Sequence, residues 1–234
     1  VTFCYIGSLL TTIGLGTPII AELISNLTGM ANTFGLRIGV ILIFCAFFIL
    51  SAARSIAKGM AVISSFNIWL ALAFYAFVFL TGPKGFILNT LVQAVGLNLQ
   101  EFITFNTYTD SIGDSGFVQG WTIFYWAWYV GLAVVTALWV ARVSYGRTFR
   151  EIIVALVVVS PLACWLSFGI LGNYGMAQEL SGKVLLSEIV ATGGTNASVV
   201  SLLETLPLPT LAFTVFPGLI FFNLAPSLTA TSPH

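Results

Sequence analysis

Charged residues are scarce in this chain. Only 7% of its 234 residues are charged, eight basic and eight acidic, whereas a soluble domain carries roughly a quarter. Hydrophobic residues make up 58%. An ordinary soluble domain is therefore excluded, and a net charge of zero argues against nucleic acid as a partner. The composition predicts an all-α integral membrane protein, with residues 1–234 as a single transmembrane domain.

Histidine and cysteine are also rare. The one histidine, His234, is the last residue, and Cys4, Cys45 and Cys164 lie far apart in apolar runs. This spacing fits neither a metal site nor a disulfide framework, so we expect no metal, no cofactor and three cysteines that are buried as small apolar residues. Because no span pairs a histidine with a carboxylate at ligand spacing, a membrane-embedded enzyme has little support.

The first apolar run, residues 1–21, has no charge and contains the sequence TTIGLG from Thr11 onward. The chain begins inside this run with Val1 and lacks a preceding basic segment, which is unlike a signal peptide. We therefore expect an internal piece of a longer protein. Hydroxyl groups within a span either bond across or along helices or face a cation, and both alternatives stay open for Thr11 and Thr12.

An aromatic stretch lies in the middle of the chain. Residues 115–141 hold no charge, six aromatic residues lie between Trp121 and Tyr129, and three arginines follow at Arg142, Arg147 and Arg150. An apolar run of this length can cross a bilayer as one helix, and arginines just beyond it mark the cytoplasmic end. The arginines most simply set topology and bind lipid headgroups, with osmotic or lipid-sensitive regulation as the alternative.

Four further apolar runs bring the number of predicted spans to six. They cover residues 38–53, 59–81, 152–178 and 211 onward, with a loop after Glu22 and a long external segment before the last span. Residues 86–105 place apolar and polar side chains on opposite faces at helical spacing, which predicts one amphipathic helix along the outer interface. Basic residues are more numerous on the links assigned to the cytoplasm, as the positive-inside rule requires.

The aromatic residues of the central span fall on two helical stripes. One stripe holds Trp121, Phe124, Tyr125 and Trp128, the next holds Trp126 and Tyr129, and Ala127 and Gly131 share a line of small residues. Aromatics at a membrane boundary form an interfacial belt, which accounts for Trp121. Trp126, Trp128 and Tyr129 lie about two turns deeper. Aromatic faces there attract a quaternary ammonium group, by roughly 0.5–2 kcal/mol per ring.

Two segments, GWTIFYWAWYVG and ARVSYGRTFREI, resemble the signature of the betaine/carnitine/choline transporter family, approximately WTIFYWAWW followed by ARISRGRTIREF. Four others, TTIGLGTPI, PKGFILNTLVQAVG, TDSIGDSGF and LLETLPLPTL, resemble segments of the same family in the same order. The resemblance extends through most of the chain. It implies an inverted-repeat secondary transporter with a leucine-transporter-like fold, of which this chain would hold about the fifth to tenth of twelve spans.

The resemblance also implies the functional residues. Trp128 and Tyr129 fall on the paired tryptophans that face the bound substrate, and Trp126 falls on a neighbour of that site. Phe124 falls on a position of the outer gate. Thr11 and Thr12 match small polar positions in the span that helps to form a cation site in sodium-coupled members.

The chain departs from the family pattern in the central and last spans. Tyr129 stands where a second tryptophan is common, and Leu132 where a third is common. In the last span, FFNLAPSL replaces FFxTSADS, so that Leu224 and Ala225 take the place of a Thr-Ser pair. Neither side chain offers an oxygen to a hard cation. A truncated or misread end of the chain is the alternative explanation.

The resemblance, together with the aromatic stretch, implies secondary active transport of a quaternary ammonium compound, such as glycine betaine, carnitine, choline or a sulfonium analogue, by alternating access. We expect coupling to sodium or protons, contact with membrane lipid, a homo-oligomer and a multi-pass location in the plasma membrane, as in the inner membrane of a bacterium. The alternative is a non-transporting sensor or structural subunit on the same scaffold, which the residues Leu132 and Leu224 keep open.

Overall fold

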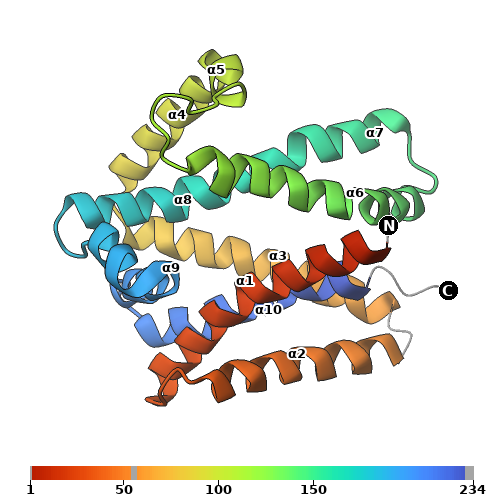
Figure 1. Ribbon diagram of the computed structural model, residues 1–234, viewed down its shortest axis with the longest axis horizontal. Coiled ribbons are helices and arrows are strands. Elements are labelled where there is room, and N and C mark those ends of the chain that lie inside the picture. The colour runs from red at the N-terminus through yellow and green to blue at the C-terminus, as the bar shows by residue number, and fades with distance from the viewer. Residues whose placement is uncertain (1, 54–56, 230–234) are drawn as a thin grey trace. The chain divides into compact units, whose positions relative to one another are not determined.

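The computed structural model describes residues 2–53 and 57–229, and the regular structure within them is entirely helical (Figure 1). In chain order the helices are α1 (Thr2–Thr28), α2 (Phe34–Ala53), α3 (Ala57–Thr81), α4 (Lys84–Gln100), α5 (Phe102–Asn106), the π-helix η1 (Val118–Ile123), α6 (Phe124–Val143), α7 (Phe149–Val154), the π-helix η2 (Ala155–Val159), α8 (Ser160–Leu180), α9 (Leu186–Glu204) and α10 (Pro209–Thr229). The described residues form two compact units, one from residues 1–11 and 88–164, the other from residues 12–87 and 165–234.

The second unit has its core around α10, which packs against α3, α2 and α9. The rings of Phe74 in α3 and Phe216 in α10 have centroids 5.9 Å apart. Leu23, Val78 and Ile87 are fully buried in this unit. Because lipid is as apolar as these side chains, close van der Waals packing rather than exclusion of water holds such helices together in a bilayer.

Side-chain hydrogen bonds also join the helices of the second unit. The Tyr174 hydroxyl lies 2.8 Å from the Thr205 hydroxyl, and the Asn173 amide donates to the Ile87 carbonyl at 3.4 Å. Tyr174 and Asn173 are both buried. A buried polar group without a partner is costly, so these contacts favour one arrangement of α8 against the residues that it meets.

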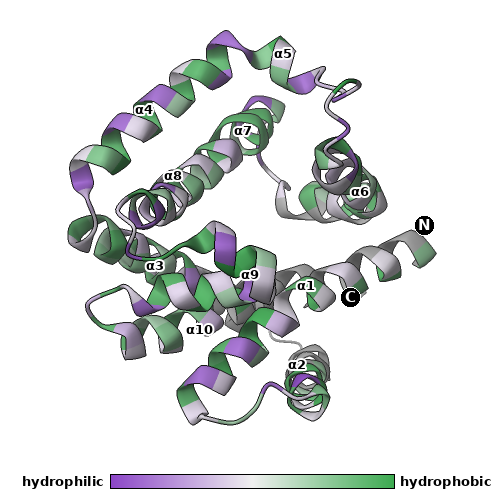
Figure 2. Cartoon of the chain, turned by 60° about the vertical axis from the view of Figure 1, so that its left-hand side comes forward, coloured by the Kyte–Doolittle hydropathy of each residue, from purple (hydrophilic) through white to green (hydrophobic). Residues whose placement is uncertain are grey.

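The first unit carries its apolar residues outward. Among its described residues none is buried, and Leu138 and Val157 are 61% and 65% exposed. Figure 2 shows hydrophobic residues distributed along α6 and α7. A helix that is apolar on all sides is suited to surroundings of lipid or other helices.

The first helix covers half of the segment after Glu22 that the sequence predicts as a loop, so the prediction is wrong for residues 24–28 and right for residues 29–33, which are not helical. α1 continues past Glu22 to Thr28, because local side chains bond back to helix carbonyls. The Asn26 amide donates to the Glu22 carbonyl at 3.2 Å, and the Thr28 hydroxyl donates to the Ile24 carbonyl at 2.7 Å. Gly29, with φ of 71°, then ends the helix in the left-handed conformation that glycine adopts readily.

The predicted amphipathic helix of residues 86–105 is two helices. α4 ends at Gln100 and α5 begins at Phe102, because Glu101 between them leaves helical geometry at φ −101° and ψ 22°. The predicted external segment before the last span contains α9, which is kinked at Gly194 (φ 80°, ψ 173°). The location of α4 at a membrane interface stays a prediction.

The helix that follows Arg147 is longer than the span predicted over residues 152–178. α7, η2 and α8 form one continuous helix of 32 residues, Phe149–Leu180. Thr148 and Glu151 start it with a capping box, in which each side chain accepts a hydrogen bond from the other residue's backbone N–H. Pro161 does not end the helix, because the wider π-turn of η2 precedes it and the Ser160 hydroxyl donates to the Ala155 carbonyl at 3.2 Å.

The cysteine prediction is wrong for two residues. Cys45 and Cys164 are exposed, because they lie on sides of α2 and α8 that no other described segment covers. The side chain of Cys4 lies outside the described part of the structure. Cys45 and Cys164 therefore contribute no packing to the helical core.

Length and apolar composition identify one helix of the described chain as able to cross a bilayer, Phe149–Leu180. The pair Ser65–Thr81 and Lys84–Gln100 qualifies if it is taken as one broken span. Shorter apolar helices are Ile13–Thr28, Phe34–Ile43 and Pro209–Ile220. The expected number of six spans stays a prediction.

Candidate functional site

The candidate site lies on α6 and the preceding η1, where five aromatic rings form a connected group: Trp121 in η1, and Phe124, Tyr125, Trp128 and Tyr129 in α6. Tyr125 lies at its centre. Its ring stacks on Trp121 at 6.1 Å and on Tyr129 at 6.4 Å, and lies 5.7 Å from Phe124 and 5.8 Å from Trp128. Distances of 4.5–7 Å between ring centroids are typical of favourable aromatic pairs. The rings therefore orient one another along α6.

The turn before α6 is a π-helix, which determines the direction in which the side chains of α6 point. η1 covers Val118–Ile123, and α6 begins directly after it at Phe124. A single π-turn rotates the following residues relative to an uninterrupted α-helix and is often found at functional sites. The 3.6-residue periodicity of the sequence does not reveal this rotation.

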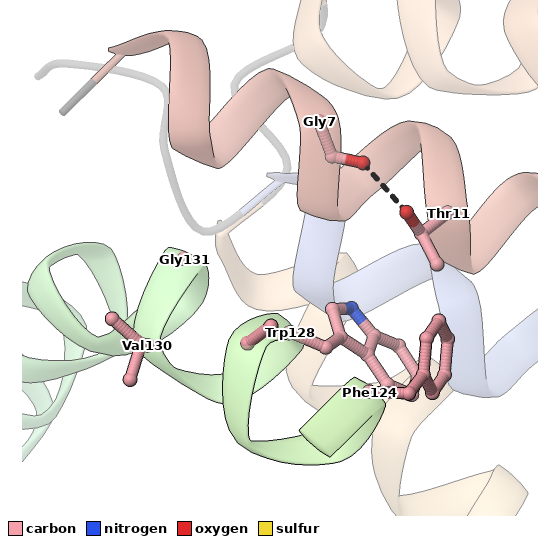
Figure 3. Close-up of a pocket in the computed structure, with 7 residues that line it drawn as sticks. Gly7, Thr11, Phe124, Trp128, Val130 and Gly131 are labelled. Carbon is pink, nitrogen blue, oxygen red and sulfur yellow. Dashed lines mark hydrogen bonds between the residues drawn. The ribbon is translucent and has the colours of Figure 1, made fainter. Parts of the chain in front are cut away.

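A cavity of about 380 Å³ lies beside these rings (Figure 3). It is lined by Gly7, Thr11, Phe124, Ala127, Trp128, Val130 and Gly131. Figure 3 shows the rings of Phe124 and Trp128 extending from α6 toward the turn of α1 that carries Gly7 and Thr11. Small-molecule sites commonly have volumes of roughly 300–1,000 Å³, so the cavity is large enough for a small organic substrate.

The α1 side of the cavity contributes one hydroxyl group. The Thr11 hydroxyl donates to the Gly7 carbonyl at 2.9 Å, a contact with the carbonyl four residues earlier that is common for threonine in helices. Both residues line the cavity. A Cβ atom at Gly7 would meet nothing within 4 Å, so the backbone of α1 is open at this point.

The structure brings three of the six predicted functional residues together and leaves two, Trp126 and Tyr129, outside the cavity lining. Phe124, Trp128 and Thr11 line it. Tyr129 touches the ring of Trp128, with centroids 6.1 Å apart, but is 64% exposed. Trp126 is 70% exposed and does not line the cavity. The side chain of Thr12, like that of Leu224, lies outside the described residues.

Five residues of this site are absent from the sequence-based set of functional residues: Gly7, Ala127, Val130 and Gly131, which line the cavity, and Tyr125, which contacts two of its rings. Gly7 supplies the carbonyl that orients Thr11, and its position four residues before a threonine is the signal that identifies it. Tyr125 contacts four neighbouring rings, and its place on the same stripe as Trp128 is the corresponding signal. Ala127 and Gly131, from the line of small residues, leave space for the cavity on α6.

The loop before η1 is organised by Asp110. Its carboxylate accepts hydrogen bonds from the Ser115 backbone N–H at 2.8 Å, the Ser115 hydroxyl and the Tyr108 hydroxyl at 2.9 Å. The hydrogen bonds from Ser115, supported by Tyr108, hold the pKa of the Asp110 carboxyl below its usual value. The hydrogen bond to Asp110, together with its negative charge, raises the pKa of Tyr108. The loop thus favours an ionised carboxylate at neutral pH.

The cavity lining is suited to binding a small organic group. All of its lining side chains are uncharged, and two of them are aromatic. The described residues contain no group of three histidines, cysteines or carboxylates that could hold a metal ion. Aromatic faces attract cations through the negative potential of the ring. The arrangement therefore favours a small cation whose charge is poorly hydrated.

Comparison with known proteins agrees with these features. Residues 1–232 match the model of the BCCT, betaine/carnitine/choline family transporter. The chain is 33% identical to a carnitine transporter of Acinetobacter baumannii over 227 aligned residues. The aligned region covers 97% of this chain and 41% of that protein. It is 32% identical over 209 residues to the uncharacterized transporter YeaV of Escherichia coli. That alignment covers 89% of this chain and 44% of YeaV.

A third relative is glycine betaine transporter 2 of Vibrio parahaemolyticus, which is 30% identical over 197 residues, with 84% of this chain and 36% of that protein covered. The chain thus spans about two fifths of the length of these curated relatives. Its relatives are membrane transporters and not enzymes. The chain belongs to the betaine/carnitine/choline transporter family.

Proposed function

We propose that the protein containing this chain is a secondary active transporter that moves a quaternary ammonium compound by alternating access. The observation that carries the proposal is the cavity beside α6, where Phe124 and Trp128 present aromatic rings and all lining residues are uncharged. Trp128 is partly buried, whereas Trp126 and Tyr129 on the same helix are exposed. Among the predicted aromatic contacts, Trp128 is therefore assigned the main role.

The cavity accounts for one end of the substrate. A trimethylammonium group gains roughly 0.5–2 kcal/mol from each aromatic face, with the larger value where water is excluded. Because the cavity lining holds no cationic side chain, the carboxylate of a betaine or carnitine must find its partners elsewhere. Spans outside this chain, which covers 41% of its carnitine-transporting relative, would supply them.

We propose six membrane spans in a leucine-transporter-like fold, with the protein located in the plasma membrane. Six helices contain at least 20 residues each: α1, α2, α3, α6, the continuous helix Phe149–Leu180 and α10. About 20 residues of helix suffice to cross the hydrocarbon core. Arg147 and Arg150 follow α6 directly, which supports a cytoplasmic location for this link.

Sodium or protons would drive the transport. Thr12 is proposed as part of a cation site in α1, and for Thr11 the cation site is the alternative to contact with the substrate. The backbone of α1 carries both residues. Leu224, which stands where the family pattern has an oxygen-bearing residue, removes one ligand of a hard cation. We therefore expect the last span to bind sodium weakly or not at all, so that transport depends little on sodium binding there.

The test is uptake by the complete transporter in proteoliposomes, with labelled carnitine, glycine betaine and choline and imposed sodium or proton gradients. We expect accumulation of at least one of them and competition by trimethylammonium compounds. If none of the three accumulates or competes, the substrate class is wrong. Saturable binding without flux would instead favour a sensor on the same scaffold, the alternative to which Leu132 points.

A further inference from the structure

We infer that Thr11 gives the cavity a preference for quaternary ammonium compounds that also carry a hydroxyl group. The inference rests on the proposed function, because it names the substrate class of the same cavity. It comes from one contact, in which the Thr11 hydroxyl donates to the Gly7 carbonyl at 2.9 Å while both residues line the cavity with Trp128 (Figure 3).

The direction of this hydrogen bond decides what Thr11 offers to a ligand. A threonine hydroxyl has one proton to donate and two lone pairs that accept. Because Gly7 takes the proton, the Thr11 oxygen can act toward the cavity only as an acceptor. A substrate hydroxyl is a donor, so the two groups are complementary. A carboxylate is an acceptor and gains nothing from Thr11.

The remaining lining residues make this oxygen distinctive. Thr11 supplies the one side-chain oxygen among the residues that line the cavity, and the others contribute rings, methyl groups or backbone. Hard cations bind several oxygen ligands at once, which this lining does not provide. The rings of Phe124 and Trp128 opposite Thr11 instead suit the trimethylammonium end of a substrate. A short molecule with both groups can meet both sides of the cavity.

Threonines elsewhere make the same bond, which provides a matched control. Thr28, in the same helix, donates to the Ile24 carbonyl at 2.7 Å but does not line the cavity. If the bond to the helix were the whole role of Thr11, both positions would tolerate valine equally. Valine has nearly the shape of threonine and lacks the oxygen, so Thr11→Val removes both the bond to Gly7 and the acceptor facing the cavity, whereas Thr28→Val removes only the bond to the helix.

The experiment measures dissociation constants for two pairs of ligands that differ only in a hydroxyl group. The pairs are carnitine with γ-butyrobetaine and choline with ethyltrimethylammonium, each bound to the complete transporter purified in detergent. We expect the unmodified transporter to prefer the hydroxylated member of each pair about 2- to 12-fold, the ratio that one net hydrogen bond supplies. Thr11→Val should reduce this ratio to about one, while Thr11→Ser and Thr28→Val should retain it.

The ratio is measured within one preparation, so partial loss of folded protein does not alter it. Equal affinities for the two members of each pair in the unmodified transporter would overturn the inference, as would an equal loss for both in Thr11→Val. The inference is also overturned if Thr11→Val changes only the sodium concentration needed for half-maximal uptake, because Thr11 would then belong to a cation site. In these cases the proposed function stands. Failure of all four ligands to bind would overturn the inference, and the proposed function falls with it if glycine betaine also fails to bind.

Discussion

The rings of Phe124 and Trp128 lie one turn apart on α6, with centroids 6.0 Å apart and planes tilted by 41°. Because both residues line the same cavity, their faces form a corner. A trimethylammonium group in this corner would contact two rings instead of one. The attraction would then exceed what a single exposed tryptophan provides.

Replacement of Trp128 should weaken substrate binding more than replacement of Trp121. Trp128 lines the cavity, whereas Trp121 does not and is 56% exposed. We expect Trp128→Ala to raise the dissociation constant for a quaternary ammonium substrate about 2- to 30-fold, which corresponds to roughly 0.5–2 kcal/mol for one ring. Equal effects of Trp128→Ala and Trp121→Ala in binding titrations would place both residues in the interfacial belt.

Tyr125 should act as a positioning residue. It contacts both cavity rings, Phe124 at 5.7 Å and Trp128 at 5.8 Å, but does not line the cavity itself. Tyr125→Ala should weaken binding about 2- to 10-fold, since an aromatic pair contributes roughly 0.5–1.5 kcal/mol. Tyr125→Phe keeps the ring and should restore the affinity. A loss in Tyr125→Phe as large as in Tyr125→Ala would show that the hydroxyl, not the ring, matters.

Replacement of Gly82 by alanine should destabilise the protein, because Gly82 lies against the core of the second unit. A Cβ there would come within 2.9 Å of the Tyr174 ring and of the Val78 carbonyl oxygen. Overpacking of this kind costs about 1–3 kcal/mol, so Gly82→Ala should lower the thermal unfolding temperature in detergent. Gly85 is the matched control, since a Cβ there meets nothing within 4 Å. Unchanged stability of Gly82→Ala would contradict this packing.

The loop around Asp110 should loosen in acid. The pKa of Asp110 is lowered in the folded protein by hydrogen bonds from Ser115, so its contribution to stability is complete above the unfolded value of about 3.9. The contribution is lost as the pH falls through the lower folded value. Hydrogen exchange of residues 108–117, corrected for the intrinsic rate, should therefore rise in that range. In Asp110→Asn this pH dependence should disappear, and its persistence would assign the effect to another group.

The sequence predicts helix ends where the chain itself contains the signal. The end of α3 at Thr81 agrees with the prediction because Gly82 and Pro83 follow it. The continuation of α1 beyond Glu22 does not, because the side chains of Asn26 and Thr28 bond to the helix, although both residue types are also frequent in loops.

The composition of the cavity is only partly predictable from the sequence. The resemblance to transporters implies functional roles for Thr11, Phe124 and Trp128, which share the cavity. Helical spacing alone does not bring the turn of Thr11 to α6, because that proximity depends on packing between segments more than 100 residues apart in the sequence. The direction of the Thr11 hydrogen bond to Gly7 also requires coordinates, since a threonine in a span can bond in either of two ways.

The most direct measurement compares choline with its uncharged carbon isostere 3,3-dimethylbutan-1-ol as competitors for binding to the complete transporter. The two molecules have almost the same shape and hydroxyl group, so a difference reports the attraction between the positive charge and the rings. We predict that choline binds at least about 10-fold more tightly and that Trp128→Ala removes most of this difference. Equal affinity of the two competitors, or a difference that survives in Trp128→Ala, would contradict the assignment of an aromatic cation site to Phe124 and Trp128.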